Sequence, residues 1–461
     1  MKDNNIVILG GGITGLTVAE RLSRTLGSKV VIIEKEPTLG GLAATVSRDG
    51  LCFDLGSHRV HPETHPAAIR YIEDIIQQPL IRRRRKGKLY FRGKFINYPP
   101  DIISLLKVFS SKDLVLSAFR YLKNLIFPAK LYPRTFETIM VRAVGRDIYN
   151  KLYRDYAKKL WGLEPAQISV EAAHRRKTVV DFKSLRNLFK ASHYFLYPRE
   201  GIGDIVKGLE KRVISQGALV IKEAELEKAS VNGRGIDILF SSPQKRNNSI
   251  KASVLVSTIP IEDLYRLFHG NDINSASLRW RGVRLVYIVL KDKIKRDSET
   301  FYFPSSEICL GRVSEIKKYS PYINPQLDNT LLTIEIPVFQ GDTIWEMPEQ
   351  KLLELCIGDL VKAGILDPNP RVLKNFSMKL AKVYPLYALN WKDNFLKLYN
   401  SFDTMHNVFS VGRRGLFLHC NIDHCILQGL ELSDMILRNQ WQDKEEWDKK
   451  VARFLSFAAR D

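Results

Sequence analysis

Short apolar runs alternate with a helical pattern in the first 34 residues. Residues 6–9 (Ile-Val-Ile-Leu) form a run of the length expected for a buried strand, and residues 30–33 (Val-Val-Ile-Ile) form a second one. Between the two runs, Leu16, Ala19 and Leu22 fall on one face of a helix. The pattern therefore predicts a β-α-β unit in this part of the chain.

The rest of the chain mixes helical and strand patterns. It predicts a basic hairpin over residues 80–98, helices over 102–127 and 135–176, strands over 218–258, 284–290, 330–336 and 408–411, and a last helix from about residue 423. Strands that alternate with helical segments indicate an α/β protein. A chain of 461 residues is too long for one simple core.

The turn between the first strand and the first helix carries the spacing Gly10-x-Gly12-x-x-Gly15. The first glycine makes the tight turn, the second lets the backbone approach a pyrophosphate, and the third permits close packing of helix on strand. Ile13 and Thr14 lead into the helix, whose free N–H groups favour a phosphate. Because strand, glycines, helix and second strand occur in this order, the sequence predicts a dinucleotide site.

The second strand ends at Glu34, which is followed by Lys35. A carboxylate in this position can accept both ribose hydroxyls and disfavours a 2′-phosphate, so FAD or NAD is favoured over NADP. We expect Lys35 to lie beside the same ligand. The doublet Gly40-Gly41, followed by Leu42, is typical of flavoproteins and favours FAD.

The C-terminal part of the chain contains a second strand, glycine turn and helix. Gly412 and Arg413 follow the apolar run 408–411, and the next helix begins near Asn421 and Ile422. The N-terminus of that helix could stabilise negative charge on a reduced isoalloxazine ring. An enzyme that binds only NAD would not need a second cofactor-binding segment so far along the chain. The alternative interpretation is an ordinary strand–loop–helix.

Net charge narrows the choice of partners. The chain has 71 Lys and Arg against 50 Asp and Glu, a net charge of +21. Such a field attracts anions, so we expect a phosphate-bearing or otherwise anionic small-molecule substrate. A peripheral contact with an anionic membrane surface stays open as an alternative. Nucleic acid is not expected, because no nucleic-acid-binding motif accompanies the charge.

Cysteine spacing and hydropathy bear on metal binding and location. The five cysteines show no CxxC pairing, which fits free thiols in a reducing compartment and predicts no metal site. No stretch approaches the ~20 apolar residues that span a bilayer. The chain enters its first strand within a few residues and leaves no room for a signal peptide. We therefore expect a cytoplasmic protein, with contact at the inner membrane surface left open.

Taken together, these features resemble the FAD-dependent amine oxidase and protoporphyrinogen oxidase superfamily, and within it the UDP-galactopyranose mutase-like branch. The N-terminal signature of the family is matched at residues 10–15, 34, 40–43 and 53–58. Less specific likeness is found at residues 91–99, 159–163, 168–176, 197–203, 256–260, 412–413 and 421–424.

The resemblance implies an α/β fold in three parts and a terminal helix. These are a discontinuous Rossmann-type (GR2-like) FAD-binding domain, a mixed-sheet substrate domain, a helical insertion and a C-terminal helix. The FAD-binding domain is expected at residues 1–80, 200–265 and 400–440, and the substrate domain at 81–100 and 266–399. The helical insertion is expected at residues 101–199 and the C-terminal helix at 441–461.

The resemblance also assigns site residues. It places Gly56, Ser57 and His58 at the flavin, and it directs Arg175 and Arg312 toward the substrate. Guanidinium groups suit a diphosphate because they bind its oxygens in pairs and stay charged. Mutases carry a further arginine and a tyrosine just before the Asn–Asp–His element, where this chain has the segment 416–420 (Leu-Phe-Leu-His-Cys). The expected diphosphate clamp is therefore incomplete.

Two chemistries fit this resemblance. We predict an FAD-dependent oxidoreductase that transfers a hydride between a substrate C–H and flavin N5, with an anionic or glycan-related substrate and with His58 or His419 as the base. The alternative is a redox-neutral mutase that uses reduced flavin on a nucleotide- or lipid-linked sugar, with Arg175, Arg312 and Arg413 neutralising the leaving group.

A flavin-binding scaffold at a membrane is a third hypothesis. It rests on the basic run 82–86 beside the apolar residues 89–91. A solvated hairpin is the more ordinary interpretation of such a run.

Overall fold

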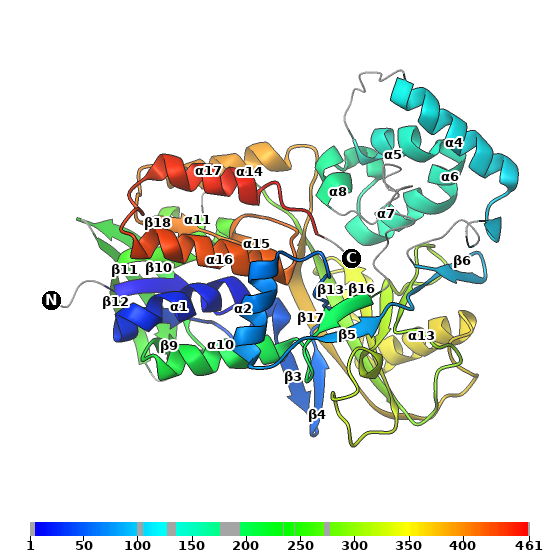
Figure 1. The fold of residues 1–461 in the computed structure, drawn as a ribbon, viewed down its shortest axis with the longest axis horizontal. Coiled ribbons are helices and arrows are strands. Elements are labelled where there is room, and N and C mark those ends of the chain that lie inside the picture. Colours follow the sequence, from blue (N-terminus) through cyan, green and yellow to red (C-terminus); the bar gives the residue numbers. More distant parts are fainter. Residues whose placement is uncertain are drawn as a thin grey trace.

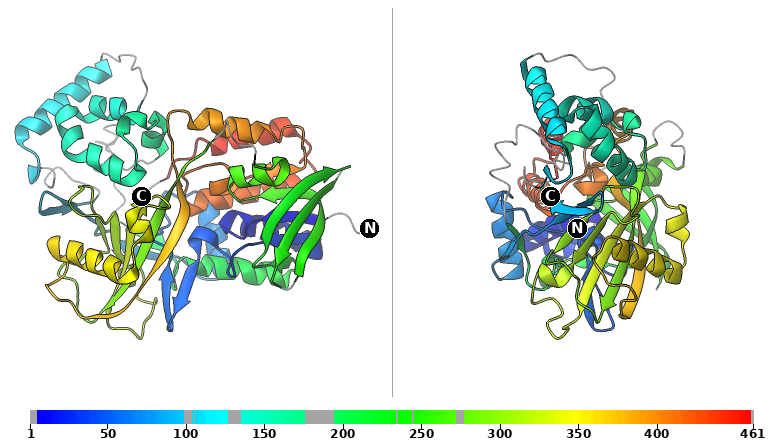
Figure 2. Two further views of the ribbon diagram at one scale, coloured as in Figure 1. Left: turned by 180° about the vertical axis from the view of Figure 1, so that it is seen from behind. Right: turned by 90° about the vertical axis from the view of Figure 1, so that its right-hand side faces the viewer.

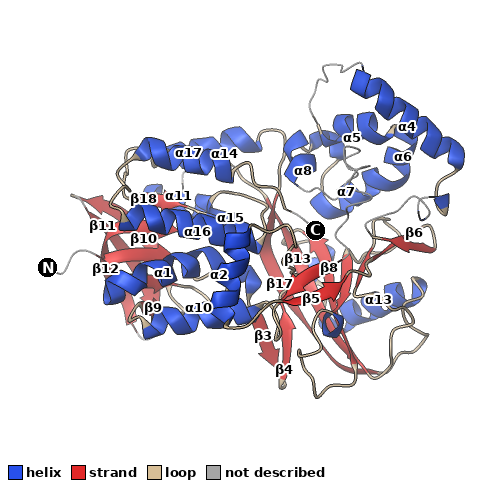
Figure 3. Ribbon diagram, viewed as in Figure 1, coloured by secondary structure: helices blue, strands red, loops and turns tan. Residues whose placement is uncertain are grey.

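The computed structural model describes residues 5–98, 104, 106–126, 135–175, 194–233, 235–243, 245–271 and 277–459. Two seven-stranded sheets form the framework, and helices cover them (Figures 1 and 3). A separate group of helices stands beyond the second sheet, at the end opposite the N-terminus (Figure 2). The predicted α/β fold class is thereby confirmed.

The first sheet contains the N-terminal β-α-β unit. Its order is β10 (Glu225–Asn232), β11 (Gly235–Ser242), β12 (Lys245–Ser257), β1 (Asn5–Leu9), β2 (Val30–Ile33) and β9 (Leu219–Ile221), and β18 (Val408–Ser410) pairs with β12. The pairs of β1 with β12 and β2, of β2 with β9, and of β12 with β18 are parallel, whereas β10 to β12 are antiparallel. Strands β1 and β2 are buried almost throughout, which explains their continuous apolar runs.

Helices from distant parts of the chain pack beside this sheet. The helix α1 (Ile13–Leu26) contacts α10 (Gly203–Ser215) and α16 (Ile422–Leu437), and α2 (Pro66–Ile76) contacts both of the latter. The remaining helices of this part are α11 (Ile261–His269), α14 (Trp391–Asn400), α15 (Gly412–Gly415) and α17 (Lys444–Phe454). The C-terminal half of the chain thus returns to the first helix.

The second sheet is mainly antiparallel. Its order is β17 (Val372–Pro385), β13 (Trp280–Leu290), β16 (Thr330–Val338), β15 (Arg312–Glu315), β14 (Thr300–Tyr302), β6 (Lys88–Phe91) and β7 (Lys94–Asn97). The strand β13, which lies between β17 and β16, is buried at every residue. Helix α13 (Glu349–Lys362) packs against β17, after the short α12 (Thr343–Glu346). Two small ribbons are formed by β3 (Thr45–Arg48) with β4 (Leu51–Asp54), and by β5 (Ile81–Arg84) with β8 (Tyr194–Tyr197).

The helical group lies over one end of the second sheet, and α7 contacts β16 (Figure 1). It comprises α4 (Ser111–Ile126), α5 (Phe136–Val144), α6 (Arg146–Ile148), α7 (Arg154–Trp161) and α8 (Val170–Arg175). Short 3-10 or π turns occur in the chain at η1 (Gly27–Lys29), η2 (Gly41–Ala43), η3 (Tyr149–Tyr153), η4 (Pro165–Gln167) and η6 (Ile316–Lys318). Among the described helices, none combines the length and the apolar character needed to cross a membrane.

The prediction of one basic hairpin over residues 80–98 is wrong in its first half. Only β6 and β7 form a hairpin, whereas β5 pairs with the distant β8. The guanidinium of Arg82 lies 3.6 Å from the centre of the Tyr194 ring, and Arg83 donates to the carbonyl of Lys318. These contacts draw the basic run onto the protein and away from a free hairpin.

A buried carboxylate joins the parts that surround the site. Asp54, at the end of β4, is 1% exposed. Its carboxylate accepts hydrogen bonds from the hydroxyls of Tyr197 and Thr45 and from the N–H of Ile202. Its backbone carbonyl accepts the hydroxyl of Tyr287, on β13, at 2.9 Å. One residue therefore links the start of α10 to the second sheet.

We predict that Asp54→Asn lowers the free energy of unfolding by about 1–3 kcal/mol, because an amide cannot accept all of these donors without turning its own N–H groups toward one of them. Asp49→Asn is the control, since Asp49 is exposed and pairs with Lys374 on the surface. Urea unfolding followed by circular dichroism measures both variants. Equal midpoints for the two variants would contradict the proposed role of Asp54.

Candidate functional site

The glycine turn leaves the start of α1 accessible. A Cβ on Gly15 would lie 2.1 Å from the carbonyl oxygen of Gly10, so helix and strand are too close for any other residue. Gly12 is the N-cap of α1, and no described side chain caps the helix there. A Cβ on Gly12 would meet no described atom within 4 Å. The helix therefore presents uncapped N–H groups to open space, as an anion site requires.

Glu34 lies against this turn, and its predicted contact with a ribose stays a prediction. Its Oε2 accepts the N–H of Gly11 at 2.6 Å, and its Oε1 accepts the N–H of Glu36 at 2.9 Å. The carboxylate is partly exposed, and Lys35 beside it is exposed. Glu34 is thus fixed by two backbone groups at the edge of the open space.

The glycine doublet forms a second wall of the same space. The N–H of Gly40 donates to the carbonyl of Gly11 at 2.8 Å. Gly41 is exposed, and a Cβ on it would lie 3.5 Å from the Cα of Gly12. Leu42 follows in the η2 turn and is half-buried. Two glycine loops and an acid therefore lie together at the open start of α1, which is the arrangement expected for binding the diphosphate and ribose of a dinucleotide.

The C-terminal return reaches the same helix start. Gly412 has φ +88°, and a Cβ on it would lie 3.0 Å from Oγ1 of Thr14. Its N–H donates to Gln428 at 2.9 Å. On α16, a Cβ at Gly429 would lie 2.9 Å from Thr17. These close approaches bring the beginnings of α1 and α16 together, where the sequence places the two halves of one cofactor site.

Arg413 and Asn421 have structural contacts within this return. The guanidinium of Arg413 donates to the carbonyls of Val383 at 2.9 Å and Cys420 at 2.6 Å. Asn421 is the N-cap of α16, in a capping box with His424, and Ile422 is the first helical residue. The expected contacts of Arg413, Asn421 and Ile422 with the cofactor stay a prediction.

The predicted flavin loop meets the predicted substrate arginine through Glu335. The N–H of Ser57 donates to Oε1 of Glu335 at 2.9 Å, and a Cβ on Gly56 would lie 3.4 Å from the same carboxylate. Arg312 binds Glu335 through Nε at 2.9 Å and Nη2 at 2.7 Å. Strands β15 and β16 hold Arg312 directly opposite Glu335. The loop that follows β4 and the second sheet therefore meet at one ion pair.

Ionisation at this junction is set by burial and the ion pair. Burial opposes the charge on Glu335, but Arg312 and the Ser57 N–H outweigh it and hold the pKa of Glu335 below its usual value. Burial lowers the pKa of His58. The Nε2 of His58 lies 3.0 Å from the carbonyl of Leu55, so the neutral ring donates from Nε2 and keeps Nδ1 as an acceptor.

A cavity adjoins the ion pair, and its space of about 400 Å³ includes the open solvent at its mouth. Its polar lining comes from α7, β14, β15, β16 and β17: Tyr156, Lys159, Tyr302, Arg312, Glu335 and Tyr384. Such a lining suits a substrate with several hydroxyl groups and negative charge.

Lys159 supports the wall of this cavity. Its Nζ donates to the carbonyls of Phe303, Ser305, Ile308 and Leu310. Burial lowers the pKa of Lys159 to about 8. The lysine therefore fixes the loop between β14 and β15, and its positive charge is compensated by carbonyl dipoles.

Glu335 and Lys159 were not predicted from the sequence as residues of the site. A signal existed for Glu335, which is the one acidic residue in the apolar run 330–338. Lys159 lies in a segment that resembles the family, but its charge gave no reason to expect four carbonyl partners. Tyr384, on β17, also lines the cavity.

Two other predicted site residues, Arg175 and His419, do not line the cavity among the described residues. Arg175 is the last residue of α8, and its side chain lies outside the described part of the chain. His419 is buried, its N–H donates to the hydroxyl of Tyr387 at 2.8 Å, and its ring meets those of Trp161 and Tyr384 edge-on. His419 thus stands behind the cavity wall at Tyr384.

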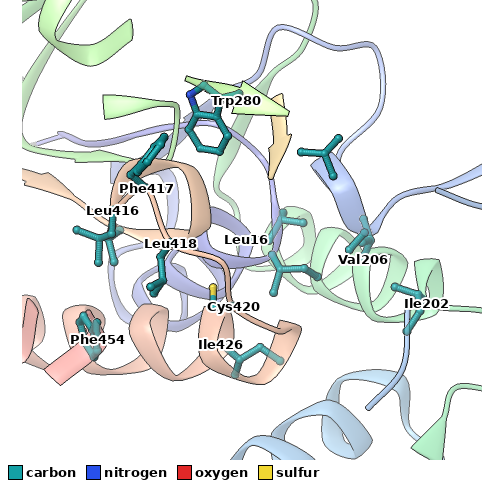
Figure 4. Close-up of a cluster of buried hydrophobic side chains, with 14 of the residues drawn as sticks. Leu16, Ile202, Val206, Trp280, Leu416, Phe417, Leu418, Cys420, Ile426 and Phe454 are labelled. Carbon is teal, nitrogen blue, oxygen red and sulfur yellow. The ribbon is translucent and has the colours of Figure 1, made fainter. Parts of the chain in front are cut away.

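The segment that replaces the diphosphate clamp belongs to the core. Leu416, Phe417 and Leu418 are fully buried, and Phe417 packs on Trp280 with ring centres 4.9 Å apart (Figure 4). Aromatic and aliphatic side chains here cannot bind a phosphate. The departure from the mutase pattern is therefore a packing feature.

Comparison with known families identifies two segments. Residues 8–75 match the NAD(P)-binding Rossmann-like domain, and residues 151–354 match the UDP-galactopyranose mutase family. The second match includes Lys159, Arg312 and Glu335. Much of the cavity therefore lies within the matched segment.

Curated relatives are distant. A probable UDP-galactopyranose mutase of Klebsiella pneumoniae is 23% identical over 179 residues, which cover 38% of this chain and 45% of the relative. The match thus spans less than half the length of that relative. A dTDP-fucopyranose mutase of Escherichia coli is 20% identical over 367 residues, which cover 76% of this chain and 90% of the relative.

Solved structures share the fold over nearly the whole chain. A reduced UDP-galactopyranose mutase superposes with a TM-score of 0.80 at 20% identity, covering 98% of this chain and 99% of the other. A putative protoporphyrinogen oxidase from Exiguobacterium has a TM-score of 0.71 at 16% identity, covering 95% and 99%. At these identities the likeness establishes the fold.

We predict that Gly15→Ala weakens FAD binding about tenfold or more, because the added Cβ must displace the turn at Gly10 at a cost of roughly 1–3 kcal/mol. Gly358→Ala is the matched control, since Gly358 lies on exposed helix α13 and its Cβ would meet open space among the described residues. Fluorescence titration of FAD measures both. Equal affinities would show that the close contact at Gly15 does not shape the site.

We expect His58 to make stability depend on pH. Its pKa in the folded chain is lowered, so below about pH 6.5 the unfolded chain takes up a proton that the folded chain resists, and the free energy of unfolding falls. His58→Asn removes this contribution. His269→Asn, at the exposed end of α11, is the control. Unfolding from about pH 8 to about pH 5 tests this; a His58→Asn curve parallel to that of the natural chain would contradict it.

Three observations indicate the same kind of protein: the order of the elements, the open glycine loops and the family matches. The segment 8–75 supplies the dinucleotide fold, and 151–354 carries much of the cavity wall. The chain therefore combines a Rossmann-like dinucleotide-binding segment with a UDP-galactopyranose mutase-like segment, and it shares the fold of a solved UDP-galactopyranose mutase and of a putative protoporphyrinogen oxidase. These matches agree with the resemblance found in the sequence and with FAD as the cofactor.

Proposed function

We propose that the protein is a flavin-dependent, redox-neutral mutase that rearranges the ring of a sugar carrying a phosphate-bearing leaving group. The observation that carries this proposal is the Arg312–Glu335 pair, which joins the Ser57 loop to a polar cavity. The mutase family match over residues 151–354 and the names of the two curated relatives support it. The proposal revises our sequence-based preference for an oxidoreductase in favour of its alternative.

The residues of the cavity have distinct roles in this reaction. Arg312 uses Nε and Nη2 to hold Glu335 and therefore offers a substrate oxygen its remaining nitrogen, Nη1. The hydroxyls of Tyr156, Tyr302 and Tyr384 can bind sugar hydroxyls or phosphate oxygens. FAD, when bound in its reduced form, supplies the nucleophile.

In the proposed reaction, His58 transfers protons and Glu335 balances positive charge. Because burial keeps His58 neutral, its Nδ1 can accept a proton and return it near neutral pH. Glu335 balances the charge of Arg312 before substrate binds, which avoids burying an isolated guanidinium. An anionic leaving group would then compete with Glu335 for the same cation.

Hydride transfer from a substrate C–H is a second candidate. It is favoured by one observation, the buried apolar segment 416–418 at the position of the expected diphosphate clamp. The guanidinium of Arg413 also donates hydrogen bonds to the carbonyls of Val383 and Cys420. Both facts reduce the cationic groups available to a diphosphate, and hydride transfer does not require them.

A panel of UDP- and dTDP-sugars separates the two candidates. The FAD-loaded protein is reduced with dithionite without oxygen, and products are analysed by chromatography. A mutase converts many equivalents of sugar with no matching loss of reducing equivalents. An oxidoreductase instead bleaches the oxidised flavin when substrate alone is added, with one reduced flavin per product, and that result would overturn the mutase proposal.

We predict that Arg312→Lys lowers kcat/KM for the converted sugar about 10–100-fold, because a lysine ammonium cannot bind Glu335 through two nitrogens and also reach the substrate. Arg371→Lys is the control, since Arg371 makes a similar forked contact with Asp292 on the exposed surface. Steady-state kinetics measure both variants, and equal losses would place Arg312 outside the site.

A further inference from the structure

Two cysteines that are five positions apart lie together at the start of α16. The Sγ atoms of Cys420 and Cys425 are 3.7 Å apart, and both thiols are free. Cys420 precedes the N-cap Asn421, and Cys425 stands in the first turn of the helix. Figure 4 shows the sulfur of Cys420 among the buried side chains around Leu418 and Ile426.

The surroundings give the two thiols different acidities. Hydrogen bonding with Cys420 and with Thr14 lowers the pKa of the Cys425 thiol, although burial works against this. The start of a helix also favours a negative charge there. The same hydrogen bond, with burial, raises the pKa of Cys420. Cys425 is therefore the thiol that supplies the reactive thiolate, and Cys420 is its protonated neighbour.

We propose that Cys420 and Cys425 are a redox-active dithiol, which closes reversibly to an intramolecular disulfide by exchange with a low-molecular-weight disulfide. The thiolate of Cys425 attacks one sulfur of the small disulfide and releases one small thiolate. Cys420 then loses its proton and attacks Sγ of Cys425, which releases the second small thiol. Two protein thiols are oxidised, and one small disulfide is reduced to two thiols.

The geometry requires only a local movement. A disulfide has an S–S length of about 2.05 Å, so the two sulfur atoms, which are 3.7 Å apart, must approach each other by about 1.7 Å. Cys425 is not fully buried, and this gives a small disulfide access to the first attacking sulfur. The three other cysteines, Cys52, Cys309 and Cys356, lie in other parts of the fold.

Closure of the pair would act on the cofactor segment. Cys425 shares a hydrogen bond with Thr14 at the start of α1, and the carbonyl of Cys420 accepts the guanidinium of Arg413 at 2.6 Å. A disulfide removes the thiol bonded to Thr14 and ties the chain before Asn421 to the helix. The thiol state is thus coupled to the segment that joins α1 and α16, whichever reaction the flavin performs.

Mass spectrometry of the FAD-loaded natural chain tests the proposal. The protein is incubated with oxidised glutathione, denatured, alkylated with N-ethylmaleimide and digested with trypsin. Both cysteines fall in one peptide, residues 415–438. We expect this peptide to lose two hydrogens and to carry no alkyl group, and dithiothreitol to restore two alkyl groups. A peptide that keeps both alkyl groups while Cys52 or Cys309 is modified would overturn the proposal.

Two variants assign the roles of the thiols. Cys420→Ser should leave a glutathione adduct on Cys425, because the resolving thiol is missing. Cys309→Ser is the matched control and should form the 420–425 disulfide as the natural chain does. Absence of an adduct on Cys425 in folded Cys420→Ser would contradict its role as the attacking thiol. The measurement on the natural chain decides the proposal even if Cys420→Ser does not fold, and flavin absorbance reports separately on the cofactor site.

Discussion

Close backbone packing at the start of α1 is the constraint on which the rest of the site depends. Gly15 lies so near the carbonyl of Gly10 that a Cβ has no room, and Gly412 approaches Thr14 in the same way. These contacts place the uncapped N-terminus of α1 beside Gly41, Glu34 and the start of α16. The close packing of the glycine turn leaves the N–H groups at the start of α1 without a side-chain cap. An anion can therefore supply the missing hydrogen-bond partners.

A second dependence runs through the buried pair of Arg312 and Glu335. The pair connects the loop at Ser57, which follows β4, to the strands of the second sheet. Burying a guanidinium without a partner costs free energy. Glu335 offsets that cost and holds Arg312 at the cavity. The same arrangement allows an incoming anion to exchange with the carboxylate. In the proposed reaction, the charge of the substrate and the position of the Ser57 loop would thereby be linked through Glu335.

Local patterns predicted the parts of the site that lie close together in the sequence. The glycine turn, Glu34 and the doublet at Gly40 follow one another within a single β-α-β unit, so spacing alone determines their meeting. The return at Gly412 was predictable because its strand, turn and helix repeat the same order. Contacts set by strand register were not predictable. Glu335 meets Arg312 only because β15 and β16 pair in one particular register.

The error at residues 80–98 has the same origin. Strand β5 contains three consecutive arginines that look like part of a basic hairpin, yet it pairs with β8 more than a hundred residues later. The cysteines at 420 and 425 also escaped notice, since their spacing is not that of a CxxC pair and becomes close only at a helix start. Sequence patterns thus identified elements and cofactor chemistry, whereas the substrate side required the three-dimensional pairing.

The most direct test of the account is a crystal structure of the protein with FAD and a nucleotide sugar. The account predicts the FAD diphosphate at the start of α1, between Gly12 and Gly41, with a substrate phosphate within hydrogen-bonding distance of Arg312. A structure in which the space at Gly12 is filled by protein side chains, or in which the sugar binds away from Arg312, would contradict it.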